Sequence, residues 1–218
     1  MLQPWISHCT IGDHTILLDA KRNRYSALST VTMNALVAGR FDEINPAILK
    51  TAKRKGWILP GSADPAQPAQ TTLRAPIGPT RQLAISGTEA YVSWPLRVKV
   101  ARALVSTRLT LAIYGLERSF DMIGIRNAQA SRQHSPQSPQ EILGGFNWAE
   151  RYILGPNVCL IRSIAMQTVL ARAGLPSQLL FGVKLYPFEA HCWLQQGDML
   201  INDTLERTGM FTPIRMVS

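Results

Sequence analysis

A stretch dominated by proline, alanine, glutamine, glycine and threonine interrupts the chain at residues 60–79 and limits what it can fold into. The stretch reads PGSADPAQPAQTTLRAPIGP, a composition that favours extended backbone and offers few large apolar side chains for a core. A single continuous domain is therefore not expected. The sequence predicts a small N-terminal domain over residues 1–60, a linker over residues 61–80 and a larger domain over residues 81–218.

The composition excludes several classes of protein. Hydrophobic residues make up 46% of the chain and charged residues 17%, which is typical of globular domains and not of disordered tails, fibres or coiled coils. The three cysteines, Cys9, Cys159 and Cys192, form no C-x-x-C pair, so a disulfide scaffold or a structural zinc site is not expected. Free thiols favour a reducing compartment, and we expect a cytoplasmic protein.

Neither a secretion signal nor a membrane span is predicted. The N-terminal run MLQPWISHCTIGDHTILLDA lacks the basic start and unbroken apolar stretch of a secretory signal. The most apolar long stretch, residues 94–116, is interrupted by four cations that are costly in hydrocarbon. These cations are Arg97, Lys99, Arg102 and Arg108.

The net charge of +9 is distributed unevenly along the chain. Residues 141–218 carry six basic and six acidic side chains, so the excess of positive charge lies entirely in the first two thirds. An acidic peptide or protein partner suits this distribution as well as nucleic-acid phosphate does. Charge alone leaves both classes of partner open.

The N-terminal residues show the pattern of three strands followed by helices. Residues 6–10 and 14–18 are β-prone runs around the turn residues Gly12 and Asp13, and residues 25–28 form a plausible third strand. Helix signals follow: a first helix from a Ser29 or Thr30 cap to near Gly39, and a second from Pro46 to Gly56. With the short GWIL segment as a last strand, this order predicts a small winged helix-turn-helix.

The C-terminal residues predict a helix followed by an antiparallel sheet. Apolar residues recur at helical spacing from Leu160 until Gly174, and alternation over residues 179–185 marks a strand. Residues 190–194 and 199–203 read as two further strands around a hairpin turn. Upstream, residues 89–120 look helical with a basic face and residues 128–140 look like a polar loop. The fold class expected for the whole chain is α+β.

Three side chains are candidates for chemistry because of where these elements place them. Cys159 lies in the first turn of the predicted helix, where unpaired backbone N–H groups favour the thiolate. If the hairpin loop comprises residues 196–198, His191 stands directly opposite Asp203, close enough for the carboxylate to hold the imidazole Nδ1–H. Trp193 shares the face of His191 and is expected to shield the pair from water.

The run NVCLIRSIAMQTVLARAGLPSQLLFGVKLYPFEAHCWLQQGDMLINDTLERTGMFTPI resembles the transglutaminase-like cysteine protease domain of the lasso-peptide B proteins, the leader peptidases of lasso-peptide maturation. The resemblance covers about residues 156–214 and rests on the helix-start cysteine, the LARAGLPSQLLFGV segment, the His-Cys-Trp run and the INDT segment. It implies a papain/transglutaminase-like fold with a catalytic triad of Cys159, His191 and Asp203. Hydrolysis of the bond between leader and core of a ribosomally made precursor peptide is the implied reaction.

The N-terminal domain is similar to the PqqD-like element that recognises leader peptides in many peptide-modifying systems. The similarity rests on the strand order and on the segments RYSAL and NPAILKTAKRKGWIL. It implies that the leader adds as an extra strand beside the third strand and packs on the last helix. The leader-binding residues it implies are Arg24, Tyr25, Ala27, Leu28, Ile48, Leu49, Ala52 and Lys53.

The same resemblance implies two partners, the precursor peptide and an ATP-dependent lasso macrolactam synthetase that receives the freed core. The sequence contains no phosphate-binding loop, so no cofactor is expected to bind directly and any ATP dependence is expected to act through the synthetase. A transamidase using the same triad and a winged-helix DNA-binding regulator are the alternative functions.

Each candidate residue also has a purely structural interpretation. Cys159 can be a buried thiol, His191 a core histidine and Asp203 a turn residue. Cys192 is expected to face away from His191 and to pack in the core, so a metal site that includes both side chains is not expected. The backbone N–H of Cys159 is expected to supply one donor of an oxyanion hole. The second donor stays open, with Asn147 and Trp148 as candidates.

Overall fold

The computed structural model describes residues 2–58, 78–83, 92–130, 137–152 and 158–218. The chain forms two compact units, Met1–Ala75 and Pro76–Ser218. The division falls within the stretch predicted as a linker, whose residues 61–77 lie outside the described residues.

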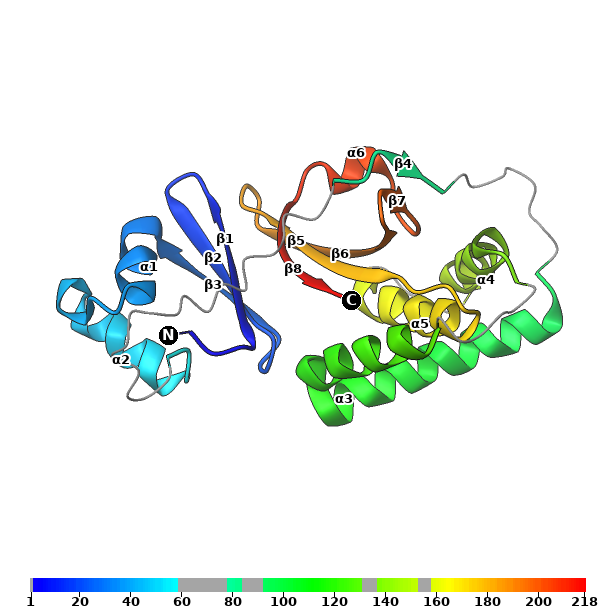
Figure 1. The fold of residues 1–218 in the computed structure, drawn as a ribbon, viewed down its shortest axis with the longest axis horizontal. Coiled ribbons are helices and arrows are strands. Elements are labelled where there is room, and N and C mark those ends of the chain that lie inside the picture. Colours follow the sequence, from blue (N-terminus) through cyan, green and yellow to red (C-terminus); the bar gives the residue numbers. More distant parts are fainter. Residues whose placement is uncertain (1, 59–77, 84–91, 131–136, 153–157) are drawn as a thin grey trace. The chain divides into compact units, whose positions relative to one another are not determined.

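The N-terminal unit begins with a three-stranded antiparallel meander in the order β1-β2-β3 (Figure 1). Its strands are β1 (Ile6–Ile11), β2 (His14–Asp19) and β3 (Arg24–Ser29). Ile11 pairs with His14, so Gly12 and Asp13 form the predicted two-residue turn, with Gly12 at a φ of 58°. The left-handed conformation explains the preference for glycine at this point.

Helices α1 (Thr30–Val37) and α2 (Pro46–Arg54) follow the meander, with the short 3₁₀ helix η1 (Phe41–Glu43) between them. Ser29 caps α1 by accepting a hydrogen bond from the Thr32 backbone N–H, and Asn45 caps α2 in the same way. The core of the unit lies between the sheet and the helices and includes Leu17, Met33 and Trp57. The last segment, predicted as a short strand, makes a single bridge between Leu2 and Ile58.

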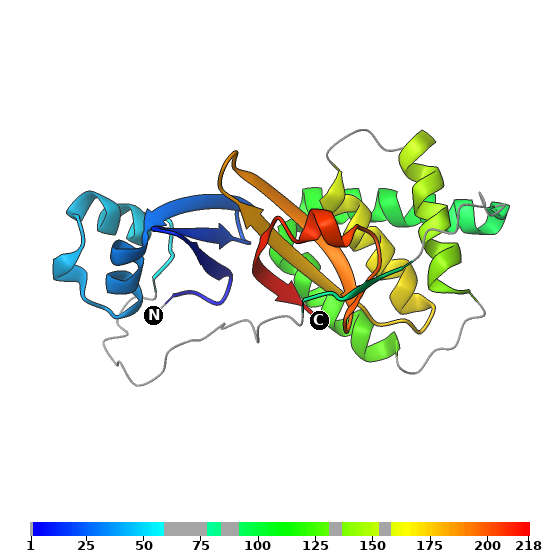
Figure 2. The ribbon, with the colours of Figure 1, turned by 90° about the horizontal axis from the view of Figure 1, so that it is seen from above.

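The C-terminal unit is a five-stranded sheet covered by helices, with strand order β4-β7-β6-β5-β8 (Figures 1 and 2). β4 runs parallel to β7 and the other neighbours are antiparallel. The strands are β4 (Arg81–Gln82), β5 (Gln178–Lys184), β6 (Glu189–Gln196), β7 (Met199–Leu200) and β8 (Thr212–Val217). The helices are α3 (Trp94–Ala130), α4 (Pro139–Tyr152), α5 (Cys159–Arg172) and α6 (Leu205–Thr208).

Helix α5 is the central element of this unit because it packs against β5 and β6 as well as against α3 and α4. Every side chain from Ser163 to Ala171 is buried, so the helix is covered on all sides over these residues and not on one face only. Helix α3 changes direction at Gly115, whose φ is 74°, and extends beyond the predicted residue 120. Part of the predicted polar loop is helical, since residues 128–130 belong to α3 and residues 139–140 to α4; residues 131–136 lie outside the described residues.

The predicted register of the last hairpin is wrong by one residue. Gln195 pairs with Leu200 and Gln196 with Met199, so the turn has two residues, Gly197 and Asp198, in place of three. β7 also ends at Leu200, and Asp203 lies beyond the ladder and not opposite His191 in it. No helix among the described residues is long and apolar enough to cross a membrane.

Candidate active site

Cys159 is the first residue of α5, as its position in the sequence predicts. The residue before it at the N-cap position, Val158, has an aliphatic side chain and makes no capping hydrogen bond. The first N–H groups of a helix have no partner within the helix, so they give this end a partial positive charge beside the sulfur. The thiol is half-buried and not oxidised to a disulfide.

His191 lies on β6, and 6% of its side chain is exposed. Its ring packs against those of Trp193 and Phe211, with centroid distances of 6.1 and 5.2 Å. Gly182 of β5 pairs directly with His191, and a Cβ at residue 182 would lie 2.8 Å from atoms of both Trp193 and Phe211. The missing side chain therefore makes room for the two rings that support the imidazole.

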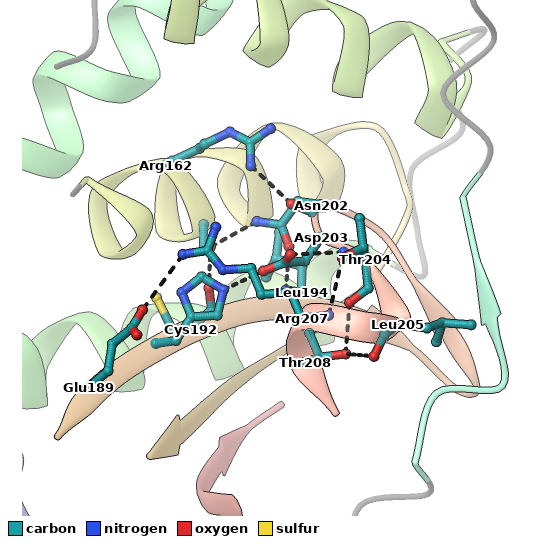
Figure 3. A network of polar contacts seen from close by, with 12 residues as sticks. Arg162, Glu189, Cys192, Leu194, Asn202, Asp203, Thr204, Leu205, Arg207 and Thr208 are labelled. Carbon is teal, nitrogen blue, oxygen red and sulfur yellow. Dashed lines mark hydrogen bonds and ion pairs between the residues drawn. The ribbon is translucent and has the colours of Figure 1, made fainter. Parts of the chain in front are cut away.

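Asp203 lies between Asn202 and Thr204 in the segment that joins β7 to α6 (Figure 3), and its side chain contacts His191. Its Oδ2 atom contacts the His191 Nε2 atom, and its Oδ1 atom accepts a hydrogen bond of 2.8 Å from the Thr204 N–H. The predicted contact between these two side chains is present, but the predicted nitrogen, Nδ1, is wrong. Since Nε2 is occupied by the carboxylate, Nδ1 is the ring nitrogen left for Cys159.

The electrostatic surroundings of Cys159 favour its thiolate, with a pKa lowered to about 4. A hydrogen bond from the Cys192 thiol is the largest cause, and burial opposes it. A hydrogen bond and the positive charge of His191 lower the pKa further. Nucleophilic cysteines are activated in this way, by a low pKa beside an imidazolium.

The pKa of His191 moves in the opposite direction, to about 9. Burial alone would lower it, but hydrogen bonds to Asp203 and Cys159 and the charges of both outweigh burial. For Asp203, burial is again outweighed, here by the hydrogen bonds from His191 and the Thr204 N–H, and the pKa is lowered. At neutral pH the three groups therefore form a thiolate, an imidazolium and a carboxylate.

Cys192 has a part in this site that the sequence did not reveal. It is buried, as expected, but its thiol also hydrogen-bonds to Cys159 and Ser163. The hydrogen bond to Cys159 is the largest cause that raises the pKa of Cys192, so this thiol stays protonated and acts as a donor. Alternation along β6 predicts that residues 191 and 192 lie on opposite faces of the sheet. It does not predict that Cys159, at the start of α5, contacts the side chains of both residues.

Arg162 and Asn202 are further members of the site that sequence reasoning missed (Figure 3). The Arg162 guanidinium donates to the Asn202 carbonyl at 3.0 Å and to Asn147 Oδ1 at 2.8 Å, and pairs with Glu150 at 3.2 Å. The signal in the sequence is an arginine three residues after Cys159, in a helix whose only other charged side chain is its last residue, Arg172. Trp148, the other oxyanion candidate, contacts Arg97, whose guanidinium carbon lies 5.0 Å from the ring centroid.

The leader-binding residues predicted in the N-terminal unit belong to β3 and α2, which border a groove of about 480 Å³. Its lining residues are Ser26, Ala27, Leu28, Ala47, Ile48, Thr51, Lys55 and Trp57. Three of the predicted residues, Ala27, Leu28 and Ile48, are among them.

The other predicted residues do not line this groove. Ala52 is fully buried in the core of the unit and Leu49 packs against that core, whereas Lys53 is exposed on the surface of α2. Arg24 and Tyr25 lie at the start of β3, opposite Asp19 and Leu18 of β2.

Among the described residues, no group of three histidine, cysteine or acidic side chains is arranged to hold a metal ion. The chemistry that the site does support is nucleophilic attack by a thiolate with an adjacent proton donor.

Comparison with known proteins agrees with this chemistry. A family model described as the transglutaminase-like superfamily matches residues 101–216, more than half of the chain. The matched residues include Cys159, His191 and Asp203. No curated protein and no solved structure matches the chain significantly.

Proposed function

Because the chain belongs to the transglutaminase-like superfamily, whose members are generally cysteine-based enzymes, we propose that it is a cytoplasmic cysteine peptidase that removes the leader from a lasso-peptide precursor. The observation that carries the proposal is the contact of His191 with Asp203 beside a Cys159 thiol whose pKa is lowered to about 4. The lasso-peptide part of the proposal is supported by the sequence resemblance described above.

In the proposed reaction, the Cys159 thiolate attacks the carbonyl carbon of the bond between leader and core. The electron pair of the carbonyl moves to its oxygen, and the N–H groups at the start of α5 stabilise that negative charge. His191 then donates its proton to the leaving amine, and a thioester with the leader remains on Cys159. His191 next takes a proton from the water that hydrolyses the thioester, while Asp203 stabilises the imidazolium in both steps.

The N-terminal unit is proposed to recruit the leader. Within the described residues β3 pairs on one side only, with β2, so its other edge can accept an added strand. The groove beside that edge presents Ala27, Leu28 and Ile48 to apolar side chains of the leader. Lys55, at its border, would attract acidic residues of the leader.

The ATP-dependent lasso macrolactam synthetase is the second proposed partner. The two steps assigned to Cys159, His191 and Asp203 conserve atoms and charge with water as the only co-reactant. We therefore assign any ATP dependence of maturation to the synthetase, which would close the ring on the freed core.

The direct test is to incubate the protein with its precursor peptide and to identify the products by mass spectrometry. The wild-type protein and the Cys9→Ala variant should release the leader, because Cys9 lies in the other unit and burial raises its pKa to about 11. The Cys159→Ala variant should release none above background. Equal cleavage by Cys159→Ala would end the proposal.

The same incubation separates the alternative functions. A product in which an added amine has replaced the core would show a transamidase, which uses the same thioester. Absence of any product, together with salt-sensitive binding of DNA by the N-terminal unit, would favour a regulator.

A further inference from the structure

We propose that Asn202 is the positioning residue that fixes Asp203 against His191, and that Arg162 and Ser163 of α5 hold Asn202 in place. The inference rests on the proposed function, since it concerns the groups assigned to catalysis there. It explains how a carboxylate beyond the end of a strand is held firmly enough to orient an imidazole.

Asn202 is 8% exposed and connects the three elements that carry the site. Its Oδ1 atom accepts a hydrogen bond of 2.7 Å from the Leu194 N–H of β6, the strand of His191. Its Nδ2 group donates at 2.8 Å to Ser163 Oγ of α5, the helix of Cys159. Its carbonyl oxygen accepts at 3.0 Å from Arg162 Nη1, in the same helix.

The Asn202 side chain replaces the next hydrogen bond of the β6–β7 ladder. The Ile201 N–H still donates to the Leu194 carbonyl at 2.9 Å, but the Leu194 N–H finds its acceptor in the Asn202 side chain in place of a backbone carbonyl. The backbone is thereby free to leave the sheet at Asn202. The next residue, Asp203, points to His191 although the strand has ended.

Arg162 also holds Asn202 in place, through its hydrogen bond to the Asn202 carbonyl. Its side chain is 13% exposed and also binds Asn147 and Glu150 of α4, so it cannot swing away without losing three contacts. Burial is the first cause that lowers its pKa, and the negative charges of Glu150, Asp203 and Cys159 oppose that effect. A largely covered guanidinium with these partners is a rigid anchor for the Asn202 carbonyl.

Asn127 of α3 provides a matched control at the other end of α5. It accepts hydrogen bonds from Gln167 Nε2 at 3.0 Å and from the Ser177 N–H at 3.2 Å, and donates to the Ser177 carbonyl at 2.9 Å. Like Asn202 it ties three segments together, but it is not next in the chain to His191, Cys159 or Asp203, whereas Asn202 directly precedes Asp203. Loss of either side chain should cost the fold a comparable amount, and only the loss of Asn202 should affect the site.

The test is to measure the pKa of His191 by NMR titration in Asn202→Ala, Asp203→Asn and Asn127→Ala. Besides Asp203, the charges of Cys159 and Glu189 act on the imidazole, and those of Arg162 and Arg207 act on Asp203; none of these four groups is altered. We expect the His191 pKa to fall by about one unit or more in Asn202→Ala, in the same direction as in Asp203→Asn. Asn127→Ala should leave it within experimental error of the wild type.

An unchanged His191 pKa in folded Asn202→Ala would overturn the inference. If that variant does not fold, Asn202→Ser, which keeps a polar side chain but is too short to reach both Leu194 and Ser163, decides: a lowered His191 pKa supports the inference and an unchanged one overturns it. The wild-type value separates the two proposals. A wild-type His191 that titrates near its ordinary value of 6.5 would contradict the proposed function itself, whereas a wild-type value near 9 with no response to Asn202→Ala contradicts only the positioning role.

Discussion

The two ends of α5 are fastened by similar hydrogen bonds but differ in charge. At the C-terminal end, Asn127, Gln167 and Ser177 form a neutral network, and the Thr168 hydroxyl accepts from Arg126 at 2.9 Å. At the N-terminal end, hydrogen bonds of the same length lead to a thiol, an imidazole and a carboxylate whose pKa values are all displaced. Amide networks give rigidity at both ends, and only the one at the N-terminal end adjoins a thiol, an imidazole and a carboxylate that support chemistry.

Of the substitutions that distinguish the two ends of α5, Asp203→Asn should have the largest effect. The amide keeps the size of the carboxylate but cannot stabilise the imidazolium, so we expect kcat/KM for peptide cleavage to fall by roughly 100-fold or more. The matched control is Asp198→Asn in the β6–β7 turn, which loses an exposed ion pair with Arg81 and should retain near wild-type activity. Similar losses in the two variants would show that Asp203 acts through the fold and not through His191.

Gly182→Ala tests whether the site at the N-terminal end of α5 also depends on the packing of the aromatic rings around His191. The added methyl group would lie 2.8 Å from Trp193 and Phe211, so we expect a loss of about 1–3 kcal/mol in the free energy of unfolding, measured in urea. Activity should fall as well, because the two rings support His191.

Gly144→Ala is the control for this substitution. Residue 144 lies in α4 with no atom within 4 Å of an added Cβ, so the change should stabilise the protein by about 0.5–1 kcal/mol. A Gly182→Ala variant as stable as the wild type would contradict the packing described for His191.

Much of the fold could be predicted because its signals are local. The turn at Gly12 and Asp13, the cap Ser29 and the proline at the start of α2 each act on the residues next to them. The last hairpin carries the same Gly-Asp signal, with Gly197 at a φ of 59°, and the predicted register is wrong because it counts Gln196 as a loop residue. A strand pattern does not predict that the Asn202 side chain accepts the hydrogen bond of the Leu194 N–H where the chain leaves the sheet.

The contacts of the site could be predicted only in part for the same reason. The helix-start position of Cys159 and the alternation around His191 can be read from neighbouring residues. The partners of Arg162 lie 15 and 40 residues away, and those of Asn202 include a residue 39 positions earlier. The choice of Nε2 over Nδ1 likewise depends on where the chain turns after β7, which only the tertiary structure fixes.

The central claim, that Cys159 exists as a thiolate beside the His191 imidazolium, is tested most directly by the pH dependence of its alkylation. Iodoacetamide labelling of each cysteine is followed by mass spectrometry of the peptides, with Cys9 as an internal comparison. The account predicts that the rate at Cys159 rises with a midpoint near pH 4 and changes again near pH 9, where His191 loses its proton. A single rise near the ordinary thiol value of 9.0 would contradict it.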